Sequence, residues 1–156
     1  MSKIKKLLPT FLILIILSNC GYTPRYAVNK NLNFTMDLVE ISGDREFNNF
    51  LKSKLRRYSN NKEANKTNYK LSLTTEFRKE IKSKHQSGLA KEYKLIATVE
   101  TIIKSEMIET KKLVFTETFV MKKIDDTFEE KNYEKTIKEN FSDIIVDRII
   151  IYLFKL

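Results

Sequence analysis

Hydrophobic and polar side chains alternate along three stretches in the middle of the chain, which is the pattern of half-buried β-strands. The clearest stretch covers residues 69–81, and further strands are expected over residues 89–107 and 113–122. Short polar links join the three stretches, and Gly88 is the residue expected at positive φ in the first link. The pattern therefore predicts an antiparallel meander.

A further strand is expected earlier in the chain, over residues 32–41. Strict alternation places Phe34, Met36 and Leu38 on one of its faces, with Glu40 a further candidate there. Val39 and Ile41 fall on the other face. The sequence Ser42-Gly43-Asp44 then ends this strand, and Ser42 or Asp44 can cap a following helix.

Two stretches carry apolar side chains at the spacing of three and four residues that is typical of helices. The first covers residues 45–58 and the second covers residues 133–154, after an acidic segment, residues 125–132, that reads as irregular. The element order is thus β-α-β-β-β-α. It predicts an α+β fold, with two helices packed on one face of a mostly antiparallel four-stranded sheet.

The first twenty residues differ in pattern from all that follows. Three lysines precede an apolar run from Leu7 to Leu17, which is far shorter than the about 20 residues of a membrane-spanning helix. Cys20, the single cysteine of the chain, comes directly after the run. This layout is typical of a secretory signal that ends at a lipidated cysteine, although Asn19 replaces the usual Gly or Ala before the cleavage point.

The N-terminal pattern divides the chain into three parts. Residues 1–19 are expected to form a lipoprotein signal peptide, residues 20–33 a lipidated tether, and residues 34–156 a single α+β domain. The alternative is an uncleaved N-terminal anchor with an incidental cysteine. With one cysteine the chain can form no internal disulfide, so the domain must be stabilised by its core, by a partner or by both.

The positive charge of the chain, +9 in total, lies mostly in its first half. Residues 45–94 hold fourteen Lys and Arg against five Glu, whereas residues 95–156 hold ten basic and twelve acidic residues. Such an imbalance favours an anionic partner. A genome biased towards Lys, Asn and Ile would explain the total charge but not its uneven placement.

Residues that could carry catalysis are scarce. His85, the single histidine, falls in a polar turn, and the chain contains no nucleophile elbow, phosphate-binding glycine loop or zinc-protease motif. Asp125, Asp126, Glu129 and Glu130 lack the ligand spacing of a calcium loop. We therefore expect no enzyme activity, no metal site and no cofactor.

Binding is better supported than catalysis. Five basic residues fall around the first hairpin of the meander, and they are the candidate ligand-binding residues: Arg78, Lys79, Lys82, Lys84 and Lys91. If the two strands pair, these charges gather at one end of the sheet, where they suit an amphiphile that carries phosphates and acyl chains. A solvated hairpin is the alternative. A nucleic acid would accept the same patch, but an exported protein is not expected to meet one.

The opening of the mature chain, CGYTPRY (residues 20–26), resembles the C-G-aromatic-x-Pro-x-Tyr opening of the LPS-assembly lipoprotein family, LptE. The order of elements is also similar to that family, including the helix REFNNFLKSKLRRY and the strands YKLSLTTEF and YKLIATVE. The likeness covers essentially the whole mature chain.

The resemblance implies an outer-membrane lipoprotein that faces the periplasm and is anchored by lipid on Cys20. Members of the family form a plug in a large β-barrel, LptD, assist its assembly, and help deliver lipopolysaccharide to the outer leaflet. The expected partners are therefore an LptD-type barrel, lipopolysaccharide and the membrane. A lipoprotein that acts as a chaperone or scaffold for other envelope proteins is the alternative.

Overall fold

The computed structural model describes residues 32–59 and 66–156. The expected signal peptide, Cys20 and nearly all of the expected tether lie outside the described residues. The elements follow the order β1 (Phe34–Gly43), α2 (Arg45–Leu55), β2 (Thr67–Lys84), β3 (Ala90–Lys104), β4 (Lys111–Lys122) and α3 (Thr127–Leu153). The predicted β-α-β-β-β-α order is confirmed.

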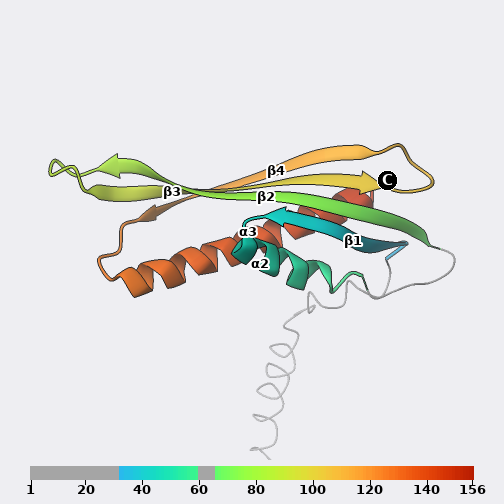
Figure 1. The fold of residues 1–156 in the computed structure, drawn as a ribbon, viewed down its shortest axis with the longest axis horizontal. Helices are drawn as coiled ribbons and strands as arrows, with labels where there is room; N and C mark the ends of the chain where they lie inside the picture. The colour runs from blue at the N-terminus through green and yellow to red at the C-terminus, as the bar shows by residue number, and fades with distance from the viewer. Residues whose placement is uncertain (1–31, 60–65) are drawn as a thin grey trace, which may run out of the picture. The chain divides into compact units, whose positions relative to one another are not determined.

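The four strands form one sheet in the order β1-β2-β3-β4. β1 runs parallel to β2, whereas β2, β3 and β4 form the expected antiparallel meander. Both helices lie against the same face of this sheet (Figure 1). The predicted fold class, two helices on one face of a mostly antiparallel sheet, is therefore confirmed.

The core lies between the sheet and the two helices. On β2, Leu71 and Leu73 point towards the helices and are almost fully buried, as the alternation of β2 predicts. Phe47 and Leu51 of α2, and Ile149 of α3, complete this layer, each with none of its surface exposed. The opposite face of the sheet carries no helix, so its side chains are mainly polar.

The expected placement of Ile41 is wrong, and a β-bulge explains why. The pairing of β1 with β2 shifts between Leu38 and Glu40, so Val39 is passed over and is 64% exposed. The extra residue reverses the alternation that follows it. Ile41 therefore returns to the helix-covered face and packs against the core, as Leu38 does.

The start of α3 also differs from the expectation, because the acidic segment 125–132 is mostly helical. The Asp126 side chain caps the helix by accepting hydrogen bonds from the backbone N–H groups of Phe128 and Glu129, at 2.8 and 2.9 Å. Glu129 and Glu130 then lie in the first turn, where the helix dipole favours negative charge. These polar interactions, rather than apolar spacing, start the helix.

Candidate functional site

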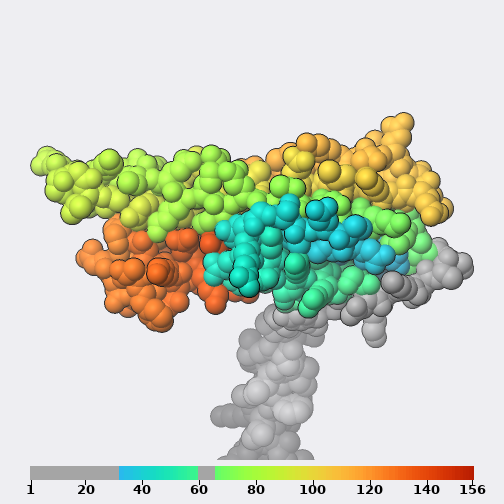
Figure 2. All heavy atoms as spheres, viewed as in Figure 1, coloured from blue at the N-terminus to red at the C-terminus, as the bar shows by residue number. Residues whose placement is uncertain are grey.

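β2 and β3 form a long hairpin whose end projects beyond both helices (Figures 1 and 2). At the turn, the His85 N–H donates to the Leu89 carbonyl at 2.8 Å, and the Gly88 N–H donates to the His85 carbonyl at 2.9 Å. Gly88 has φ of 83°, which confirms the expected position of positive φ. We call residues 82–91 the hairpin tip.

Two irregularities in strand pairing occur next to this turn. The paired residues are Ile81 with Tyr93, Ser83 with Glu92, and Lys84 with Ala90. Lys82 and Lys91 are therefore both passed over in the register. Bulges of this kind redirect side chains locally and increase the twist of the strands.

Three of the candidate residues lie together in the hairpin tip: Lys82, Lys84 and Lys91. All three are exposed. None has an ion-pair partner among the residues that the structure describes. Three cations within ten residues, at the end of a projecting arm, form a surface that can bind an anionic group without first breaking internal ion pairs.

Arg78 comes before the hairpin tip on β2 and lies on the face of the sheet that no helix covers. Its guanidinium is 3.4 Å from a Glu76 carboxylate oxygen and 3.5 Å from one of Glu80. Half of the Arg78 side chain is exposed, so both pairs are screened by water. Two acidic neighbours nevertheless reduce the positive potential at this position.

Lys79 points to the opposite face, towards α3. Its ammonium is 2.8 Å from Glu130 and 3.1 Å from Glu134, and it lies 4.3 Å from the centre of the Tyr93 ring. Burial on its own would lower the pKa of Lys79, but hydrogen bonds to Glu130 and Glu134 raise it above the ordinary value. The structure thus holds Lys79 against α3 and separates it from the hairpin tip.

The Lys79–Glu130 contact belongs to a network that sequence reasoning did not find. Glu130, only 8% exposed, also pairs with Lys123 at 2.9 Å and accepts the Ile124 N–H at 3.1 Å. Burial on its own would raise the pKa of Glu130, yet the hydrogen bonds from Lys79, Lys123 and Ile124 lower it to about 2. The network fastens the start of α3 to β2 and to the segment that follows β4.

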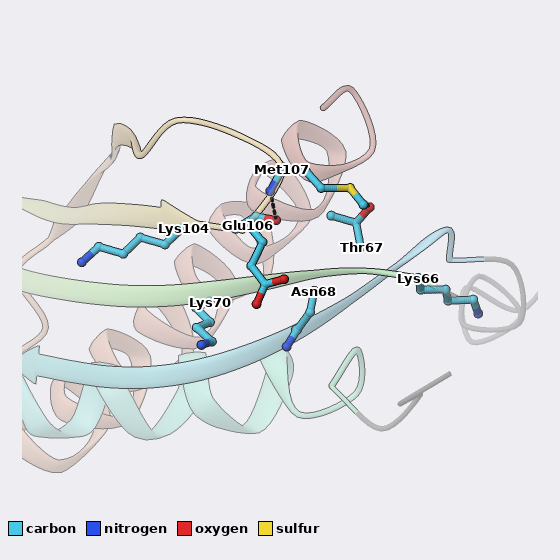
Figure 3. Close-up of a pocket in the computed structure, with 8 residues that line it drawn as sticks. Lys66, Thr67, Asn68, Lys70, Lys104, Glu106 and Met107 are labelled. Carbon is cyan, nitrogen blue, oxygen red and sulfur yellow. Dashed lines mark hydrogen bonds between the residues drawn. The ribbon is translucent and has the colours of Figure 1, made fainter. Parts of the chain in front are cut away.

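A hollow of about 430 Å³ lies at the other end of the hairpin, where β2 begins and β3 ends (Figure 3). Lys70 and Lys104, which are directly paired across the two strands, line it together with Lys66 and Glu106. Met107 closes one side, and its sulfur is 3.7 Å from the Thr67 hydroxyl. This hollow was not predicted from the sequence, because only the register brings Lys70 opposite Lys104.

Neither region has the composition of a metal centre. Within residues 32–59 and 66–156, no group of three or more His, Cys, Asp or Glu side chains is arranged to hold a metal ion. No helix in the described part of the chain is both long and apolar enough to cross a membrane. What both regions offer is a cluster of lysines.

The same arrangement of helices and strands occurs in solved bacterial proteins. Rare lipoprotein B from Shewanella oneidensis superposes with a TM-score of 0.55 and 15% sequence identity, over 76% of this chain and 98% of that chain. A minor lipoprotein from Acinetobacter baumannii gives a TM-score of 0.52 at 14% identity, over 78% of this chain and 96% of the other. This chain has the fold of rare lipoprotein B.

A lipoprotein from Caulobacter crescentus agrees, with a TM-score of 0.54 at 14% identity, over 77% of this chain and 88% of that one. Neither a protein-family model nor a curated protein sequence matches the chain. The structural likeness therefore concerns the fold alone. It is the LptE-like fold, as the opening residues and the element order led us to expect.

Proposed function

We propose that this chain is a non-catalytic lipoprotein of the outer membrane, attached through lipid on Cys20 and facing the periplasm. Its domain forms a plug in an LptD-type β-barrel, assists assembly of that barrel, and helps deliver lipopolysaccharide to the outer leaflet. The hairpin tip is the element that meets the phosphates of the lipopolysaccharide.

The projecting, cationic hairpin tip is the observation that carries this proposal. Lys82, Lys84 and Lys91 are exposed and have no acidic partner in the described part of the chain. The negatively charged oxygens of a lipid phosphate would supply such partners. Arg78 and Lys79 are the other two basic candidates near this hairpin, but their neighbouring carboxylates make them secondary candidates.

The anchor and the barrel partner are supported by the sequence and by the shared fold. The signal layout ends at Cys20, and the opening CGYTPRY resembles that of LptE. Solved proteins with the same fold are themselves described as lipoproteins. An anchor with several acyl chains would hold the domain at the membrane far more firmly than a single chain could.

Purification of the full chain from its native membranes tests this proposal. We expect a large β-barrel protein to co-purify, and the N-terminal peptide to begin at Cys20 with the added mass of acyl chains. Recovery of soluble periplasmic partners alone would contradict the plug and favour the chaperone or scaffold alternative. An unmodified, uncleaved N-terminus would contradict the lipid anchor.

A further inference from the structure

One end of the sheet gathers the point where the chain enters the domain, the end of α3 and the hollow of Figure 3. Phe34 of β1 pairs with Thr67 of β2. Its ring packs edge-on against the ring of Phe154, with the two ring centres 5.3 Å apart. The Thr67 hydroxyl contacts Met107 in the link between β3 and β4. We call residues 32–34, 66–70, 104–107 and 151–156 the anchor end.

The anchor end exposes apolar side chains that a water-facing surface would not require. Met107 is 79% exposed, Ile151 54%, Phe154 46% and Leu156 43%. Three of them belong to the last six residues of the chain, and one of these three, Phe154, packs against Phe34. Apolar and aromatic side chains at an exposed rim are typical of surfaces that enter the interfacial layer of a membrane.

Lysines accompany these apolar side chains. Lys70 and Lys104 lie directly opposite each other on the open face, which is unfavourable for two like charges in the absence of an anion between them. Neither forms an ion pair within the described residues, although Asp37 and Glu106 lie nearby. Asp37 instead accepts a hydrogen bond from the Asn68 amide at 3.1 Å.

The length of the chain before the domain limits how far the anchor end can lie from a lipid on Cys20. Leu32 comes only twelve positions after Cys20, a stretch that spans about 40 Å when fully extended. The eighteen residues of β2 carry the hairpin tip about 55 Å away from this end. The anchor end is therefore the part of the domain that lies nearest to Cys20 along the chain.

We propose that the anchor end is a membrane-contact surface, in which Lys70 and Lys104 bind the phosphates of anionic lipid headgroups while Phe154, Leu156 and Met107 enter the interfacial layer. This inference rests on the proposed lipid anchor at Cys20. It assigns the hollow of Figure 3 to lipid headgroups, and it separates this surface from the lipopolysaccharide-binding hairpin tip.

Site-specific labelling of the acylated full-length protein tests the proposal. Because acylation consumes the thiol of Cys20, Leu156→Cys and Ser87→Cys each introduce one free thiol, at the anchor end and at the hairpin tip respectively. Each variant is labelled with an environment-sensitive fluorophore and reconstituted into vesicles of phosphatidylethanolamine and phosphatidylglycerol that contain a nitroxide-labelled lipid. We expect strong quenching at position 156 and little at position 87.

Charge reversal then tests the role of the two lysines. In the Leu156→Cys background, Lys70→Glu with Lys104→Glu should reduce the quenching at position 156 about tenfold or more. Vesicles of phosphatidylcholine alone should reduce it similarly. The matched control, Lys82→Glu with Lys84→Glu, changes two exposed lysines of the hairpin tip and should leave quenching at position 156 unchanged. Circular dichroism checks that each variant is folded.

The possible outcomes separate this inference from the proposed function. A protein that fails to float with vesicles contradicts the lipid anchor. A protein that floats but is quenched equally at positions 156 and 87 overturns the membrane-contact surface alone. Loss of quenching on addition of inorganic phosphate would assign the hollow to a free anion, and would also overturn the proposal.

Discussion

Gly43, the last residue of β1, has φ of 103°, a conformation that side chains with a Cβ rarely adopt. A Cβ at this position would also lie 1.8 Å from the carbonyl oxygen of Thr75, its partner on β2. Gly88 has a similar φ of 83°, but a Cβ there would meet open space. Substitution of Gly43 should therefore cause both backbone strain and steric overlap, whereas substitution of Gly88 should cause backbone strain alone.

We expect Gly43→Ala to lower the free energy of unfolding by more than about 2 kcal/mol, because strain and overlap add. Gly88→Ala should lower the free energy of unfolding by only about 1 kcal/mol, because it introduces backbone strain without overlap. Urea denaturation of the two variants, followed by circular dichroism, measures the difference. Equal losses would show that the backbone at Thr75 moves aside readily.

Glu130 makes the stability of the protein dependent on pH. Its pKa is about 2 in the folded protein and 4.5 ordinarily, so its stabilisation is fully present above about pH 4.5 and is lost as the pH falls towards 2. At neutral pH, Glu130→Gln should therefore lower the free energy of unfolding by roughly 3 kcal/mol.

Denaturation of wild type and Glu130→Gln at a series of pH values checks this prediction. The difference between the two should shrink as the pH falls from 4.5 to 2. Glu129→Gln is the control, since Glu129 is exposed and has no ion pair in the described part of the chain. A difference that stays constant with pH would contradict the role of ionised Glu130.

At the scale of elements, alternation predicted the meander well because long strands with one buried face show their period in the sequence. It failed for Ile41, because the extra residue Val39 reverses the pattern, and for residues 127–132, where α3 lacks apolar spacing. The start of that helix is set by a cap and by the ion pairs of Glu130, which involve residues distant in sequence.

The cap of α3 can be tested directly. Asp126→Ala removes the acceptor of two backbone N–H groups and should cost about 1 kcal/mol, which corresponds to a loss of about 3 °C in Tm. Asp125→Ala, one residue earlier, changes the charge equally without removing the cap. Thermal unfolding should therefore leave the Asp125 variant close to wild type, and equal shifts would indicate a charge effect rather than capping.

At the scale of the whole molecule, the two ends of the sheet carry separate groups of lysines. Lys82 and Lys84 lie at the hairpin tip, and Lys70 and Lys104 lie at the anchor end. Reversal of a pair of exposed charges changes the local potential without disturbing the core. Each pair can therefore serve as the control for the other.

We expect Lys82→Glu with Lys84→Glu to weaken the binding of purified lipopolysaccharide about tenfold or more, since two attractive charges become repulsive. Lys70→Glu with Lys104→Glu should have a much smaller effect. Titration of the folded variants with fluorescent lipopolysaccharide measures both changes in binding. Unchanged binding in the first variant would remove the hairpin tip from the lipopolysaccharide site.

The five candidate residues illustrate how far the sequence alone could define a site. Their proximity along the chain correctly indicated a basic hairpin, and strand periodicity could have shown that Arg78 and Lys79 point to opposite faces. The carboxylates that surround Lys79 could not have been foreseen. They come from α3, about fifty residues later, and only packing brings them to β2.

The sequence by itself determined the order of the elements, the α+β class and the buried faces of β2 and β3, because these depend on local periodicity. Tertiary structure alone decided the parallel pairing of β1 with β2, the bulge at Val39, the burial of Glu130 and the hollow between Lys70 and Lys104. Each of these depends on register or packing between segments far apart in the chain, which local patterns do not specify.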